Sequence, residues 1–416
     1  MKQTSSKIER FNRGLVIWGV LTALSPLHAG AVTQQIRAAF KPDPANPQHN
    51  TFTNTTPVSG FCLDNPSQCQ ALNLFSLRLP IRSESNATIR AGHTNERSGA
   101  MFNIPSQWQS IIVTHPTAPP QEVKFRVAGM GVSYRLPKPA PELTDGAGHD
   151  YLFEGGIWRY AGPPCTGLSG AGDDMGFNSF WRHPVGAGTC AKKAMFDIPQ
   201  PFKYETFDIT YELMTPNPLQ MVSGQYTGQH AFSVGPNRDF DLGDVMVADD
   251  NVIVFDFLLD VQHALKVDIP PGGDKVRLVP SGGWQNWLQA GRRPERLFRD
   301  QLFHISTSSR FKMLLDCRIS GFDGLIEDPV SRRSIKLKIY VSMPDGITDH
   351  TGNPVKELLL RAGPSYGRIM QPGHYVERQP GVLHFEIAPH EMSQMLQPGV
   401  ASRYSGDVTV IWDSEA

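Results

Sequence analysis

Short apolar runs that alternate with polar residues constrain the fold of this chain most strongly. In EVKFRVAGMGVSYRL, Val123, Phe125 and Val127 alternate with charged residues, and FDITYELM, SIKLKIYV and VLHFEIAP repeat the pattern. Neighbouring side chains of a β-strand point to opposite faces, so this spacing predicts strands that bury one face. The chain also contains Gly 38 and Pro 34. Short strands separated by Gly and Pro turns are typical of antiparallel sandwiches.

The length of the chain, 416 residues, allows two domains of ordinary size. MTPNPLQMVSG, residues 214–224, holds two prolines between two strand patterns. We place the domain boundary there, which gives an N-terminal domain at 32–215 and a C-terminal domain at 220–416. The fold class that we predict is all-β, with two β-sandwich domains. Helical turns are expected only at GGWQNWLQAGRRPERLFRDQ, residues 282–301, and at APHEMSQML, residues 388–396.

The charge balance argues against nucleic-acid binding. Lys+Arg 39 against Asp+Glu 40 gives a net charge of −1. Proteins that bind nucleic acid usually carry a basic excess that neutralises phosphates. We therefore expect no nucleic-acid partner.

The first 31 residues have the layout of a secretory signal peptide. Four basic residues precede an apolar stretch at 14–24: Lys2, Lys7, Arg10 and Arg13. Ala29-Gly30-Ala31 then supplies a small-x-small cleavage pattern. The alternative is a membrane anchor, but an apolar stretch of about 11 residues is too short to span a bilayer comfortably. We predict an exported mature protein without a membrane span.

Export makes the cysteines candidates for disulfides. The chain has five: Cys62, Cys69, Cys165, Cys190 and Cys317. Sequence neighbours are the expected partners, which pairs Cys62 with Cys69 and Cys165 with Cys190. Spacing alone leaves the connectivity open. A zinc site is disfavoured because there is no CxxC and no His at ligand spacing nearby.

None of the catalytic motifs that we looked for is complete in the sequence. GLSGAG fails the G-x-S-x-G pattern because residue 171 is Ala, and the chain has no H-E-x-x-H, phosphate loop or G-x-G-x-x-G. The acidic stretch NRDFDLGDVMVADDN does not fit the EF-hand spacing, so a polar turn is the simpler interpretation. We predict a protein that is not an enzyme and holds no cofactor and no metal.

Aromatic and polar residues gather near the expected Cys165–Cys190 loop. Sugar sites use ring faces together with a few placed polar groups. This makes the following residues receptor-binding candidates: Trp158, Arg159, Tyr160, Asp173, Asp174, Asn178 and Trp181. The alternative is that Trp158 and Trp181 belong to the core of the sandwich.

Three stretches of the second half resemble the pilin-type domain of chaperone–usher pilus tip subunits from Gram-negative bacteria. They are SGQYTGQHAFSVGPNRDFDLGD (223–244), HALKVDIPPGGDKVRLVPSGGWQNWLQAGRRPERLFRDQLFHI (263–305) and YSGDVTVIWDSEA (404–416). In the first half, SGFCLDNPSQC (59–69) is similar to the start of such two-domain adhesins.

This resemblance implies an incomplete immunoglobulin-like domain that lacks its last strand. A periplasmic chaperone would lend that strand, and an adjacent pilus subunit would replace it at the outer-membrane usher, which is donor-strand exchange. Val408, Val410 and Trp412 would point into the open core beside the missing strand, with Ile411 facing the other way. Such domains commonly carry a disulfide, but Cys317 has no following partner, so we expect a buried free thiol.

The function that we predict is a fimbrial tip adhesin. The first domain would bind a host receptor or glycan, and the second would anchor the protein at the fimbrium tip on the cell surface. One alternative is a non-adhesive minor subunit or initiator. The other is a secreted carbohydrate-active enzyme, which would need a close pair of carboxylates in a cleft, for example between residues 150 and 190.

Overall fold

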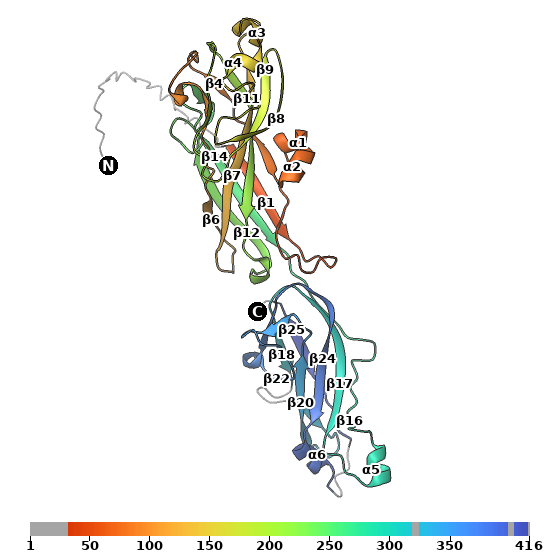
Figure 1. Cartoon of the computed structure of the whole chain (residues 1–416). Coiled ribbons are helices and arrows are strands. Elements are labelled where there is room, and N and C mark those ends of the chain that lie inside the picture. Colours follow the sequence, from red (N-terminus) through yellow and green to blue (C-terminus); the bar gives the residue numbers. More distant parts are fainter. Residues whose placement is uncertain (1–31, 318–323, 398–402, 415–416) are drawn as a thin grey trace, which may run out of the picture.

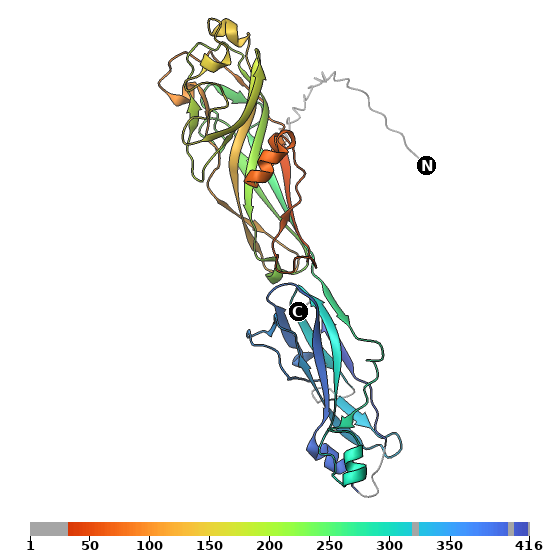
Figure 2. The same ribbon diagram turned by 45° about the vertical axis from the view of Figure 1, so that its right-hand side comes forward.

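The computed structural model describes residues 32–317, 324–397 and 403–414. The expected signal peptide, residues 1–31, lies outside this part of the chain. As predicted, the described residues form an all-β structure, and the strands build two sandwiches arranged end to end (Figures 1 and 2). No helix of this part is long and apolar enough to cross a bilayer.

The first sandwich has a smaller and a larger sheet. The smaller sheet has the order β12 (Gly224–Ser233), β14 (Val252–Val261), β1 (Val32–Phe40), β2 (Thr53–Asn54). The larger sheet has the order β13 (Met246–Ala248), β4 (Ser83–Ser85), β11 (Lys203–Met214), β7 (Gln121–Arg135), β9 (Gly176–Arg182), β8 (Thr166–Asp173). β3 (Phe75–Leu79) pairs with β11, β6 (Gln109–Val113) pairs with β7, and β10 (Cys190–Lys192) pairs with β5 (Ala100–Phe102).

Alternation along β14 explains how the smaller sheet covers the core. Every second residue is buried, and the exposed fraction of Ile253, Phe255 and Phe257 is 1% or less. On the facing sheet, Phe125 of β7 lies with its ring centroid 5.3 Å from that of Phe255. Burying a side chain of this size contributes about 2 kcal/mol. This aromatic packing joins the two sheets of the first sandwich.

The first core extends further along the chain than the sequence predicts. β1 pairs in parallel with β14, and β12 pairs with the opposite edge of β14. The buried side chains of all three strands belong to the first core, whereas the first residue packed against the second core is Leu265. The core therefore does not change at 214–224, and we propose residues 262–264 as the boundary. Residues 223–244, used above for the resemblance to a pilin domain, lie in the first sandwich.

The second sandwich is also made of two sheets. The larger has the order β15 (Leu265–Asp268), β17 (Leu297–Thr307), β24 (Val376–Ile387), β20 (Ser334–Ser342), β19 (Gly324–Glu327). β16 (Val279–Pro280) pairs with β17, and β22 (Leu358–Leu360) pairs with β20. The smaller sheet has the order β21 (Ile347–Asp349), β23 (Arg368–Pro372), β18 (Phe311–Asp316), β25 (Thr409–Asp413).

The described helices are short and lie at the margins of the sandwiches. They are α1 (Phe61–Asp64), α2 (Pro66–Leu72), α3 (Ala140–Leu143), α4 (His149–Leu152), α5 (Gln285–Ala290) and α6 (Pro389–Met395). α5 and α6 confirm the helical turns expected within 282–301 and 388–396. Both lie at the end of the second sandwich that is remote from the first (Figure 1).

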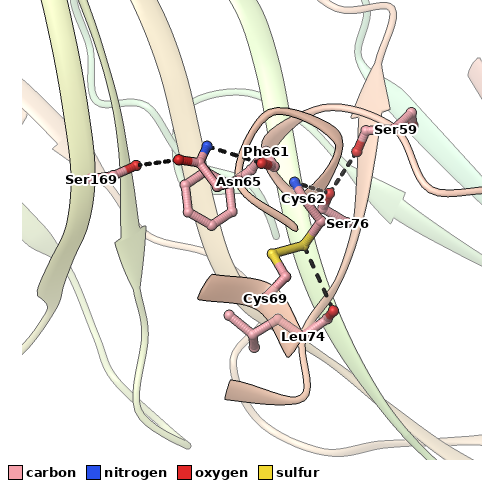
Figure 3. The surroundings of a disulfide bond; sticks show 8 residues. All are labelled: Ser59, Phe61, Cys62, Asn65, Cys69, Leu74, Ser76 and Ser169. Carbon is pink, nitrogen blue, oxygen red and sulfur yellow. Dashed lines mark hydrogen bonds between the residues drawn. A yellow bond between two sulfur atoms is a disulfide. The ribbon is translucent and has the colours of Figure 1, made fainter. Parts of the chain in front are cut away.

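Both expected disulfides are present, Cys62–Cys69 and Cys165–Cys190. The first joins α1 to α2 (Figure 3). The amide of Cys62 donates to Ser76 Oγ at 2.8 Å, so the helical clip is also held to β3. Its Phe61 ring stacks on Phe180 of β9 with centroids 4.3 Å apart. The clip therefore covers the outer face of β9.

His263 joins the two sandwiches at the proposed boundary. Its Nε2 donates to the carbonyl of Met221 in the first sandwich at 2.8 Å, and its Nδ1 accepts from Ser308 Oγ in the second at 3.1 Å. Ser308 Oγ also accepts from the amide of Ala264 at 3.0 Å. Burial lowers the pKa of His263, which favours the neutral ring that this pattern of donors and acceptors requires.

Candidate functional site

The last described strand, β25, is seated on the second core. Val408, Val410 and Trp412 pack against this core, while Ile411 is 39% exposed, which is the alternation that the sequence predicts. The Trp412 ring contacts Phe303 of β17 and Phe311 of β18, with centroids 5.0 and 5.9 Å away. The three inward side chains are only half-buried. This face of the core is therefore incompletely covered.

β25 stands at the end of its sheet. It pairs with β18, from Lys312 opposite Asp413 to Asp316 opposite Thr409, and among the described strands no other pairs with it. β15 likewise ends the larger sheet, pairs with β17, and carries half-buried Leu265 and Val267. Stacked sheets keep their strands roughly aligned. Because Trp412 lies against β17, we infer that the position beside the free edge of β25 lies across from β15.

The two tryptophans of the expected receptor site are core residues. Trp158 and Trp181 are both 0% exposed, with ring centroids 4.7 Å apart. The Trp181 indole Nε1 donates to the Trp158 carbonyl at 2.9 Å. Because Phe180 is covered by the α1–α2 clip and Trp181 faces the main core, β9 is buried on both faces at these two residues. Neither tryptophan can offer a ring face to a ligand, so this part of the prediction was wrong.

Arg159 and Tyr160, in contrast, lie together at the surface. The Arg159 guanidinium lies over the Tyr160 ring, 5.2 Å from its centroid, and its Nη2 donates to the Tyr160 hydroxyl at 3.3 Å. Tyr160 is 52% exposed. A cation over an exposed ring contributes about 0.5–1 kcal/mol. The pair presents a planar, hydrogen-bonding surface.

Asp173, Asp174 and Asn178 lie on the exposed hairpin of β8 and β9. Asp173 Oδ1 accepts from the amides of Met175 and Gly176, each at 2.9 Å. These backbone hydrogen bonds lower the pKa of the Asp173 carboxyl. Asn178 Oδ1 accepts from the amide of Ala171 at 3.0 Å. The Asp173 carboxylate and the Asn178 side-chain oxygen therefore already stabilise the hairpin.

The hairpin and the Arg159–Tyr160 pair approach each other at Gly170. A Cβ added there would lie 3.1 Å from the Arg159 Cβ and 2.8 Å from the Asn178 carbonyl. Only glycine accommodates this approach without movement of its neighbours. Arg159 therefore packs against the face of the hairpin that carries Phe177 and Ser179, whereas the exposed Asn178 side chain alternates with them.

The first sandwich has a hollow that was not predicted from the sequence. It is a groove of about 880 Å³ beside β4, β11 and β13. Its lining includes Arg82, Glu84, Asn86, Lys203, Glu205 and Val247. Glu205 lies at a bulge in the pairing of β11 with β7, and bulges re-aim side chains. The alternation of exposed residues along β4 and β11 was the sequence pattern that could have indicated this groove.

Cys165, His183 and Cys190 place their ligand atoms within 4.8 Å of one another. The two sulfurs are joined as a disulfide, so they offer no thiolate to a metal. Burial lowers the pKa of His183 to about 4, which keeps its ring neutral at pH 7.

Cys317 is free, as expected, but it is half-buried rather than buried. Burial, with the Asp316 carboxylate, raises the pKa of its thiol.

Comparisons with known proteins give only distant likenesses. No protein-family model matches the chain, and no curated protein matches it. Among solved structures, a chaperone–tip adhesin complex of CFA/I fimbriae is similar at 9% identity and a TM-score of 0.24, over 93% of this chain and 97% of that chain.

Two further structures are similar to the same degree. CfaE, the adhesive subunit of the CFA/I fimbria of enterotoxigenic Escherichia coli, has 7% identity and a TM-score of 0.23, over 92% of each chain. The CsuC–CsuE chaperone–tip adhesion subunit pre-assembly complex of Acinetobacter baumannii has 8% identity and a TM-score of 0.23, over 92% of this chain and 98% of that chain. At these TM-scores the likenesses carry no argument, so function has to be argued from the residues.

Proposed function

We propose that this protein is a tip adhesin of a chaperone–usher pilus. The first sandwich, residues 32–261, would bind a host receptor or glycan. The second, from residue 265 onward, would attach the protein to the pilus by accepting a donor strand. The observation that carries this proposal is the free edge of β25 among the described strands, where half-buried Val410 and Trp412, with Val408 just before the strand, face an incompletely covered core.

Strand addition suits this edge on physical grounds. An unpaired edge presents backbone N–H and C=O groups to any extended chain. Half-buried apolar side chains near it, such as Leu265 and Val267 of β15, would be covered by alternate residues of an added strand. A periplasmic chaperone would supply this strand first, and the adjacent subunit would replace it at the outer-membrane usher.

The test is capture of a chaperone in the periplasm. The chain would carry a tag at the start of its mature sequence, and its co-purifying proteins would be identified. The proposal expects one periplasmic chaperone at about equal molar amount, and aggregation of the chain when that chaperone is deleted. A soluble, monomeric chain in the deletion strain would contradict the proposal.

On the first sandwich, the proposed receptor surface is the Arg159–Tyr160 pair. Both side chains of the pair are exposed, and each offers hydrogen-bonding groups to a sugar or peptide. A glycan and host-cell binding screen with the chaperone-bound chain tests this role. Binding that is lost when Tyr160 is replaced would support it.

The burial of Trp158 and Trp181 favours one alternative. Without these rings the surface loses its largest candidates for stacking on a sugar. A minor subunit that initiates the pilus but binds no receptor would need no such surface. The same screen separates the two functions, because only an adhesin would bind host cells or glycans.

A carbohydrate-active enzyme receives less support. Such an enzyme needs two carboxylates free to act on the scissile bond. In the expected region, Asp173 is committed to two backbone amides of its own turn. That the protein is not an enzyme stays a prediction, and assays with the glycans that bind would check it.

A further inference from the structure

Lys192 is a buried cation in the first sandwich. It is 4% exposed and lies on β10 two residues after Cys190, on the same face of the strand. Its Nζ donates to three backbone carbonyls, of Gly156 at 2.8 Å, Ile157 at 2.9 Å and Tyr160 at 2.7 Å. An ammonium has three N–H donors. All of them are therefore satisfied.

These carbonyls take the place of a counter-ion. Among the described residues no carboxylate forms an ion pair with Lys192, and burial lowers its pKa to about 8. Three carbonyl oxygens around one cation oppose that shift, because hydrogen bonds to the charged form stabilise it. The arrangement resembles the oxygen coordination of a free monovalent cation, with the cation attached to the chain.

All three carbonyls belong to one loop of tight turns. The amide of Gly156 donates to the Phe153 carbonyl at 3.3 Å, and the amide of Tyr160 donates to the Ile157 carbonyl at 3.0 Å. Gly156 has φ 91°, in the left-handed region that glycine favours. The loop turns its carbonyls inward to the ammonium and directs Arg159 and Tyr160 outward.

Removing the ammonium would leave these inward carbonyls without their partner. A buried acceptor that loses its donor costs the full desolvation of that group. The carbonyls of Gly156 and Tyr160 would then be satisfied only by rotation of the loop toward solvent. The conformation that displays Arg159 and Tyr160 would then keep only its other anchor, the buried Trp158, whose carbonyl accepts from Trp181 Nε1.

We propose that Lys192 is a positioning residue, an internal cation that holds the loop at 156–160 in the shape that displays Arg159 and Tyr160. The proposal rests on the proposed function only for the use of that surface in receptor binding. Its test therefore measures the loop itself, which neither receptor binding nor chaperone capture affects.

Trypsin provides a local probe, because the exposed Arg159–Tyr160 bond lies within the loop. The variants Lys192→Ala and Lys192→Met would be made in the full exported chain, in the complex recovered from the periplasm. We expect cleavage at this bond to be about tenfold faster in both variants, as local opening becomes easier. Cleavage at the wild-type rate in Lys192→Met would overturn the proposal.

Chemical rescue separates the cation from general packing. Methylammonium chloride should enter the cavity of Lys192→Ala and return cleavage to within about twofold of wild type. It should not rescue Lys192→Met, whose side chain fills the cavity. Tetramethylammonium chloride at the same concentration has no N–H donor and should rescue neither. Equal effects of the two salts on Lys192→Ala would contradict the internal-cation role.

The control for global destabilisation is Val123→Ala. Val123 is 0% exposed in the same core but remote in sequence from the loop. It should lower the Tm without faster cleavage after Arg159, and equal acceleration would overturn the local interpretation.

If the Lys192 variants do not fold, ¹⁵N NMR of the lysine ammonium groups in the wild-type chain tests the proposal instead. One slowly exchanging ammonium is expected at pH 6, and none would refute the proposal.

Discussion

The ring of Trp412 meets that of Phe303 edge to face, with centroids 5.0 Å apart and planes at 62°. Phe303 is 0% exposed in the second core, whereas Trp412 belongs to a strand that ends its sheet. Aromatic pairs of this geometry contribute about 0.5–1.5 kcal/mol beyond burial. The contact holds β25 against the core, beside the edge at which we expect a partner strand to add.

Replacing Val410 by lysine should abolish chaperone capture. Val410 faces the second core, and an unpaired charge placed there would oppose both the seating of β25 and the docking of a strand. We expect at least about a tenfold loss of co-purified chaperone. Deletion of residues 408–416 should have the same result, although the last two of these lie outside the described residues.

Ile411→Lys is the matched control for Val410→Lys. The two residues are neighbours on β25, but Ile411 points outward. The control should capture chaperone like wild type. Normal pilus incorporation of Val410→Lys, or equal losses in both variants, would refute the docking role of this face.

Tyr160→Ala should reduce receptor binding about tenfold while lowering stability by no more than about 1 kcal/mol, the contribution of the exposed cation–π contact. The side chain is 52% exposed and stacks only under Arg159 at the surface. The measurement is binding of the chaperone-bound chain to host cells or to a glycan array. Ile112→Ala, at a residue 56% exposed elsewhere on the first sandwich, is the control and should bind normally.

His183 should make the first sandwich less stable in acid. Burial lowers its folded pKa to about 4, below the unfolded value of 6.5. As pH falls through 6.5 the unfolded chain takes up the proton first, so the free energy of unfolding decreases until about pH 4. Between pH 7 and 5 this amounts to about 2 kcal/mol.

Urea unfolding at pH 7 and 5 checks this linkage. His183→Gln should remove that part of the pH dependence and leave the rest, including the contribution of His263, whose pKa is also lowered. If wild type and His183→Gln lose the same stability between the two pH values, His183 is not the group responsible.

The two disulfides should contribute unequally to stability. Cys165–Cys190 closes a longer loop, with a sequence separation of 25 against 7 for Cys62–Cys69. By loop-closure entropy the losses are about 3.5 and 2.4 kcal/mol, respectively. Paired replacement by serine, followed by urea unfolding, measures both. A larger loss at Cys62–Cys69 would show that the anchoring of the α1–α2 clip outweighs loop length.

The sequence predicted the positions of the strands better than it predicted which strands pair. The alternation in VIVFDFLLDV identifies β14, but nothing local indicates that it pairs with β1, some 220 residues earlier. Because a strand pattern specifies which face is buried and not what covers it, β12 and β14 were placed in the wrong sandwich. The disulfides were predictable because neighbouring cysteines, in a chain that the sequence predicts to be exported, are expected to close short loops.

The prediction of the receptor site was wrong at positions where adjacent residues have opposite environments. Trp158 is buried and Arg159 is exposed, since successive residues of a turn point in different directions. Phe180 is buried by the α1–α2 clip on one face of β9, a contact between distant segments, and Trp181 is buried by the main core on the other face. The burial of Lys192 could have been suspected from the sequence, because a strand period of two places it on the same face as Cys190.

Hydrogen exchange along β25 tests the central claim most directly. The exchange of the backbone amides of residues 409–413 would be compared between the chaperone-bound chain and the chain after removal of the chaperone. We predict strong protection of these amides in the complex, and loss of protection with aggregation once the chaperone is removed. A stable monomer whose β25 amides remain equally protected without a partner would contradict the account.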